Sequence, residues 1–138
     1  HEPEAARALR ISATYLCDER VAIQGVQIYG SPWTPSLGWA FSRSPMALQD
    51  HWAELPDGID VLITHGPPLG ARDQDAKRQH CGDAALAAAV RELRPRLHIY
   101  GHIHAGYGRM TNEGTTFLNA SSCTRHYEPI NPPLVIDL

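Results

Sequence analysis

The chain has 138 residues, of which 43% are hydrophobic, and a formal net charge of −3 at pH 7. This length fits one domain, and the apolar fraction is large enough for a buried core, which excludes a disordered chain. No run of Lys and Arg stands out, and no apolar run approaches the roughly 20 residues of a membrane span. We therefore expect neither a nucleic-acid track nor a membrane segment. The three cysteines are odd in number and widely spaced, which favours a reducing, cytoplasmic setting.

The first part of the chain predicts two strands and a helix. Residues 1–10 are typical of a loop that enters a short helix. Two short alternating runs, 21–23 and 26–29, are separated by a Gln-Gly pair, which predicts a β-hairpin. The Ser-Pro pair at 44–45 predicts the cap and first position of a helix over 46–55.

The middle of the chain alternates apolar strands with a helix. Residues 59–63 are β-branched and almost wholly apolar, which predicts a strand covered on both faces. Residues 69–81 are polar and read as a loop, and the Ala-rich segment 82–93 predicts a helix. A second buried strand is expected over 97–100.

The last part of the chain is expected to be mostly β-structure. Segments 107–111 and 115–119 flank an Asn-Glu-Gly turn and predict a second hairpin. Leu134–Leu138 reads as a final buried strand. Because strands alternate with helices in the middle and pair as hairpins at the ends, we expect an α/β domain with a mixed sheet.

Histidines follow the two predicted buried strands. His65 comes after one of them, and His102 and His104 come after the other. Ligands bind beyond the carboxyl ends of the strands in open α/β sheets. In an extended segment, residues i and i+2 project to the same side, so His102 and His104 are expected to share a pocket. The pattern favours a metal site over isolated structural histidines, because close-packed polar side chains need a shared partner.

The motifs around these histidines resemble those of a known family. Thr-His-Gly-Pro-Pro at 64–68 and Gly-His-Ile-His at 101–104 resemble the last two motifs of the calcineurin-like metallophosphoesterases. The metallophosphoesterase-domain-containing branch of that family is resembled further at 31–35, 60–70, 101–108, 119–121 and 131–137. The resemblance implies that residues 1–138 are the C-terminal part of a single domain. It also implies a fold of mixed β-sheet layers flanked by helices, half of a four-layer αββα sandwich.

The resemblance implies a site with two divalent metal ions that activate a water for attack on a phosphoester. His65 and His102 would bind one ion and His104 the other, with Mn²⁺ expected and Fe, Zn, Ni or Mg as alternatives. His1 looks like part of the family's Gly-Asn-His-Glu motif, so it would contact the phosphate and protonate the leaving group. Tyr107 and Asn119 are expected to contact the substrate, with a packed aromatic and a polar turn as the respective alternatives.

Two further motifs of the family, Asp-x-His and Gly-Asp, would precede His1. Neutral imidazoles do not neutralise two divalent ions, so residues 1–138 alone are expected to bind metal weakly and to hydrolyse little. The parent protein is expected to hydrolyse small phosphodiesters, such as cyclic nucleotides. The alternatives are a nucleotide-binding or protein-interaction module that has lost turnover, and a fragment that does not fold alone. The sequence leaves the oligomeric state open.

Overall fold

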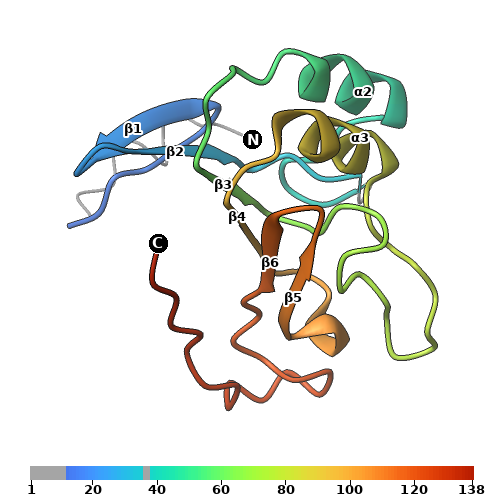
Figure 1. The fold of residues 1–138 in the computed structure, drawn as a ribbon. Helices are drawn as coiled ribbons and strands as arrows, with labels where there is room; N and C mark the ends of the chain where they lie inside the picture. Colours follow the sequence, from blue (N-terminus) through green and yellow to red (C-terminus); the bar gives the residue numbers. More distant parts are fainter. Residues whose placement is uncertain (1–11, 36–37) are drawn as a thin grey trace.

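A single mixed sheet organises the structure, a computed structural model that describes residues 12–35 and 38–138. Its six strands lie in the order β1-β2-β3-β4-β6-β5 (Figure 1). The four central strands run parallel to one another, and the pairs β1–β2 and β5–β6 are antiparallel. The expected α/β domain with a mixed sheet is thus confirmed. The helix expected within 1–10 and the residue His1 lie outside the described residues.

The elements follow the predicted order along the chain. The strands are β1 (Glu19–Ile23), β2 (Val26–Ser31), β3 (Val61–Thr64), β4 (Leu97–Tyr100), β5 (Gly108–Asn112) and β6 (Thr115–Asn119). The helices are α2 (Pro45–Ala53) and α3 (Ala84–Leu93), with a single turn of 3₁₀ helix, η1 (His104–Gly106), after β4.

Both predicted hairpins are confirmed, and their turns share one geometry. Gln24 and Gly25 join β1 to β2 with φ angles of 51° and 85°. Glu113 and Gly114 join β5 to β6 with φ angles of 49° and 87°. Positive φ at both central residues is type I′ geometry, whose twist matches that of the paired strands. Glycine takes the second position at little steric cost.

Side-chain caps start both predicted helices. Ser44 accepts a hydrogen bond from the Ala47 N–H at 3.3 Å and begins α2, which ends at Ala53, two residues before the predicted end. Asp83 caps α3 through one carboxylate oxygen, which accepts two N–H groups of the first turn. Its other oxygen accepts the Trp52 indole N–H at 2.7 Å. One carboxylate therefore caps α3 and ties it to α2.

The two faces of the sheet are covered differently. Helices α2 and α3 lie together over one face (Figure 1), and the main core packs there. It includes Tyr29, Leu48, Trp52, Leu62, Leu86, Val90, Tyr100 and Phe117. The opposite face presents a smaller cluster of Val61, Leu97 and Leu118. One helical layer on one sheet is the arrangement expected for half of an αββα sandwich.

Two expectations about buried strands are corrected. The strand expected over 134–138 is wrong, because the described structure has no β-ladder there. Leu134 and Ile136 pack against the sheet face, whereas Val135 is 87% exposed. An extended segment crossing a sheet alternates in burial as a strand does, so the pattern could not separate the two. Ile63 of β3 is 38% exposed, so that strand is not covered on both faces.

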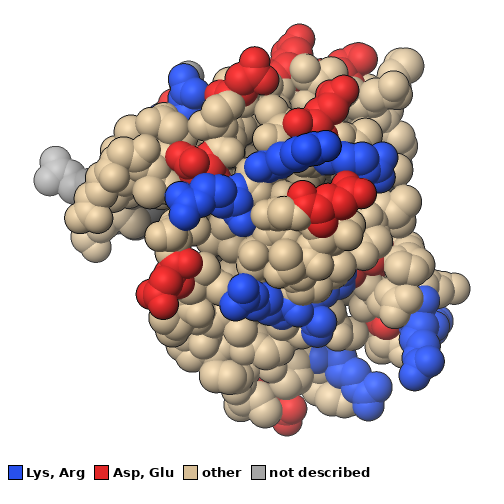
Figure 2. Space-filling model, viewed as in Figure 1, with Lys and Arg blue, Asp and Glu red and all other residues tan. Residues whose placement is uncertain are grey.

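Charged side chains of both signs are interspersed on the face seen in Figure 2. In the described part of the chain, no helix has the length and apolarity that a bilayer crossing requires. Cys17, Cys81 and Cys123 form no disulfide among the described residues.

His98 of β4 is a fully buried imidazole. Its Nε2 lies 2.9 Å from the Thr64 hydroxyl, which donates its own proton to the Gly66 carbonyl at 2.7 Å. The hydroxyl therefore accepts from His98, which places the ring proton on Nε2. Nδ1 has no hydrogen-bond partner among the described residues. Protonation would bury an uncompensated charge, and burial lowers the pKa of His98 to about 3.

Stability is expected to fall in acid because of His98. Its contribution is fully present above pH 6.5, the pKa of an ordinary histidine, and is lost as the pH falls toward 3. The loss amounts to roughly 2 kcal/mol at about pH 5, since each unit of pKa difference is worth about 1.4 kcal/mol. Urea unfolding at about pH 7 and about pH 5 measures this loss. His98→Gln should reduce the pH dependence by that amount, and the exposed His126→Gln should leave it unchanged. An equal pH dependence in all three proteins would contradict the assignment.

Candidate metal centre

Two parallel strands bring His65 and His102 to one edge of the sheet. The register of β3 and β4 pairs Ile63 with Ile99. Two residues further along each strand, the Gly101 N–H donates to the His65 carbonyl at 3.0 Å. The strands therefore end at the same level; His65 follows β3 directly, and His102 follows β4 after Gly101.

The two rings face each other at a spacing suited to a shared ion. His65 Nε2 lies 3.1 Å from His102 Nδ1, and the ring centroids are 4.8 Å apart. Two nitrogens bound to one tetrahedral ion, each at about 2.05 Å, lie about 3.3 Å from each other. Small ring adjustments would thus let both nitrogens face one cation.

Both imidazoles are held toward their neutral form. Partial burial lowers the pKa of His65, although the residue as a whole is exposed to solvent. Burial also lowers the pKa of His102, and the neighbouring His65 and His104 lower it further. The neutral ring is the form that binds a metal ion, so this environment favours metal binding over protonation.

The expectation that His102 and His104 lie on an extended segment is wrong. His102 has a φ of 66°, in the left-handed region, and the Ile103 N–H donates to the Gly101 carbonyl at 2.7 Å. His104 then begins the 3₁₀ turn η1. A left-handed residue reverses the course of the chain, so the alternation of side chains along a strand does not hold here.

His104 is held by contacts of its own with the C-terminal part of the chain. Its Nδ1 lies 3.0 Å from the Thr124 carbonyl, and its ring packs edge-on against Tyr127 at 5.1 Å. A carbonyl accepts only from an N–H, so the proton sits on Nδ1 and the Nε2 lone pair is free. A carbonyl on the second ring nitrogen is the usual outer contact of a metal-bound histidine. Within the described residues, no three His, Cys, Asp or Glu side chains form a ligand set.

A groove of about 520 Å³ adjoins His104. Its lining includes polar, aromatic and charged side chains: Gln74, Asp75, Arg78, Tyr107, Thr124, Arg125 and Asn131. The Tyr107 hydroxyl donates to the Pro132 carbonyl at 2.7 Å, which holds the ring against the C-terminal segment. Contact between Tyr107 and a substrate stays a prediction.

Asn119 lies behind the histidine loop, at the end of β6, and its exposed fraction is 0%. Its amide nitrogen donates to the carbonyls of Ile103 at 2.8 Å and Arg72 at 3.2 Å. The predicted contact with a substrate stays a prediction, and the observed contacts are all internal.

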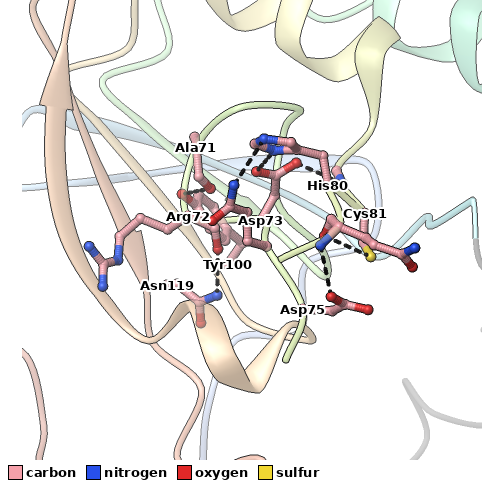
Figure 3. A network of polar contacts seen from close by, with 11 residues as sticks. Ala71, Arg72, Asp73, Asp75, His80, Cys81, Tyr100 and Asn119 are labelled. Carbon is pink, nitrogen blue, oxygen red and sulfur yellow. Dashed lines mark hydrogen bonds and ion pairs between the residues drawn. The ribbon is translucent and has the colours of Figure 1, made fainter. Parts of the chain in front are cut away.

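The sequence motifs gave no sign of a polar network in the loop between β3 and α3 (Figure 3). Asp73 is 1% exposed and accepts from His80 Nδ1 at 2.8 Å and from the Gly82 N–H at 3.0 Å. The Tyr100 hydroxyl donates to the Ala71 carbonyl at 2.7 Å. Burial raises the pKa of Tyr100, with Arg72 opposing and Asp73 adding to the shift. Gly106 and Gly108, on both sides of Tyr107, were the signal in the sequence that this backbone lies very close to another segment, here Arg72.

Known proteins resemble this chain across nearly its whole length. Human and mouse Metallophosphoesterase domain-containing protein 1 are each 48% identical to it over 139 residues, which cover 98% of this chain and 43% of the relative. UPF0046 protein T07D4.2 of Caenorhabditis elegans is 40% identical over 137 residues, 97% of this chain and 35% of that protein. The chain thus spans less than half the length of these relatives.

A solved crystal structure, 19% identical in sequence, has a TM-score of 0.60 and covers 77% of this chain and 45% of its own. At that identity the likeness supports the α/β fold alone. No model of a protein family matches the chain. With 48% identity over 98% of its length, the chain is similar to a part of the human and mouse metallophosphoesterase domain-containing proteins.

Proposed function

We propose that the protein containing this chain is a metal-dependent phosphoesterase that hydrolyses small phosphodiesters, including cyclic nucleotides. The observation that carries the proposal is the 3.1 Å approach of His65 Nε2 and His102 Nδ1 at the ends of two parallel strands. The similarity to the human metallophosphoesterase domain-containing protein, 48% identity over 98% of this chain, supports the same reaction class.

Each histidine has a distinct part in this proposal. His65 and His102 would hold one divalent ion, and His104 would hold a second through its free Nε2. Mn²⁺ is the proposed metal, and carboxylates from elsewhere in the protein would complete both sites. A bound pair of ions supplies a nucleophilic hydroxide and neutralises charge on the phosphoryl oxygens. The Thr124 carbonyl orients the His104 ring, and His1 would donate a proton to the leaving group.

The groove beside His104 supports a substrate larger than inorganic phosphate. Its volume of about 520 Å³ falls within the range of small-molecule sites. Tyr107 could stack on a base, and the guanidinium of Arg125 could pair with an anionic group. We therefore propose a nucleotide or similar small phosphoester as the ligand, with no nucleic-acid or membrane partner. The odd number and wide spacing of the three cysteines support a cytoplasmic location for this protein.

Loss of one imidazole is expected to weaken metal binding. His102→Ala in the full-length protein should lower Mn²⁺ affinity and phosphodiesterase activity by more than roughly 100-fold, since removal of outer contacts alone costs 10–100-fold. Isothermal titration with Mn²⁺ and a cyclic-nucleotide assay measure the two effects. His126→Gln is the matched control for metal affinity, because His126 is exposed and is not one of the predicted ligands. Unchanged affinity and rate in His102→Ala would refute the assignment. Metal-independent nucleotide binding without turnover would favour a binding module.

The charged ligands outside residues 1–138 are expected to matter as much as the imidazoles. A protein of these residues alone should bind Mn²⁺ far more weakly than the full-length protein, because neutral rings cannot balance two divalent charges. Titration of both proteins gives the comparison, and His65→Ala in the short protein reports the background from other histidines. Tight binding and robust hydrolysis by the short protein would contradict this prediction.

A further inference from the structure

We propose that Arg72 is a positioning residue that, together with Asn119, holds the loop of residues 102–108 in place. We call this pair the Arg72–Asn119 clamp. The contacts stand on the structure alone, and their consequence for metal binding rests on the proposed function.

The Arg72 guanidinium holds one side of the loop by its backbone carbonyls. Nε donates to the Gly106 carbonyl at 2.7 Å, Nη2 to that of Tyr107 at 2.6 Å, and Nη1 to that of Arg109 at 3.4 Å. Gly106 ends η1, so its carbonyl has no helical partner and needs a donor. Hydrogen bonds from a charged donor are shorter and stronger than neutral ones. All three guanidinium nitrogens of Arg72 thus donate to the loop or to Arg109, the residue that follows it.

Asn119 holds the other side of the loop. Its amide nitrogen donates to the carbonyl of Ile103, the residue between the two imidazoles, and to the carbonyl of Arg72. Its amide oxygen accepts from the N–H and the hydroxyl of Ser121 at 3.2 and 2.7 Å. Both donors and the acceptor are therefore occupied, which fixes the orientation of the amide.

Two glycines let the loop approach the clamp this closely. A Cβ at Gly106 would lie 1.9 Å from the Arg72 carbonyl oxygen and 2.8 Å from Asn119 Nδ2. A Cβ at Gly108, where φ is 125°, would lie 2.8 Å from Arg72 Nη2. No other residue fits at these distances without displacing the loop or the clamp.

The clamp is itself anchored to the sheet. Arg72 lies between two anchored residues in the chain: the Tyr100 hydroxyl, at the end of β4, donates to the carbonyl of Ala71, and the buried Asp73 accepts from His80 and the Gly82 N–H. Asn119 is the last residue of β6. The loop between His102 and Gly108 is therefore tied through Arg72 and Asn119 to the ends of two neighbouring strands. Figure 3 shows Tyr100 and Asn119 beside Ala71 and Arg72. Loss of the clamp frees the histidine-bearing turn while the sheet remains.

The test compares variants of Arg72 in the full-length protein. Arg72→Gln removes the charged guanidinium with its three donor nitrogens, and Arg72→Lys keeps the charge but has a single nitrogen donor. We expect Mn²⁺ affinity to fall roughly 10–100-fold in Arg72→Gln and less in Arg72→Lys, as for lost outer contacts of metal ligands. Activity should recover at saturating Mn²⁺, with KM for the substrate unchanged. The imidazole NMR signals of His102 and His104 should shift in the metal-free protein.

The control is Arg94→Gln, because Arg94 is exposed and shares the left-handed backbone, with a φ of 49° against 48° for Arg72. It should leave metal affinity and imidazole signals unchanged. Unaltered signals and affinity in Arg72→Gln would overturn the clamp, and so would a raised KM at unchanged metal affinity. If the parent protein neither binds metal nor hydrolyses phosphodiesters, the proposed function fails, but the metal-free NMR signals still decide on the clamp. If Arg72→Gln does not fold, Arg72→Lys provides the same readouts.

Discussion

The candidate site depends on the parallel pairing of β3 with β4. Their ladder continues past the strands to the hydrogen bond between the Gly101 N–H and the His65 carbonyl, so both strands end at one level. Parallel pairing requires a crossover, and α3 supplies it while covering the helical face of the sheet. A one-residue slip of either strand would turn its side chains to the other face and separate the two imidazoles.

Much of this framework was predictable because local rules specify it. The Gln-Gly and Glu-Gly pairs select type I′ turns, Ser44 and Pro45 begin a helix, and the apolar runs of β3 and β4 mark central strands. The position of histidines after two such strands was enough to predict that His65 and His102 would meet. Each of these features depends on a few neighbouring residues, and tertiary packing agrees with the local preference.

The rest could not be read from the sequence because it depends on contacts between distant residues. Arg72 meets the carbonyl of Gly106 across 34 positions, and no local pattern indicates that a loop arginine will turn inward. His102 adopts a left-handed turn where an extended segment was predicted. The contacts of Ile103 and Gly106 outweigh the usual preference of a histidine for negative φ. The Thr64–His98 pair is likewise visible only once the strands are side by side.

The C-terminal segment covers one face of the sheet with side chains alone. Leu134 and Ile136 lie against Val61, Leu97 and Leu118, but the segment adds no strand to the sheet. A segment that packs without backbone pairing can detach locally, since no β-ladder hydrogen bonds must break before its apolar contacts separate. The sheet face beneath it, where Ile63 is already partly exposed, would then present an apolar patch that favours association with other molecules. Truncation of this tail should therefore affect solubility before it affects the fold.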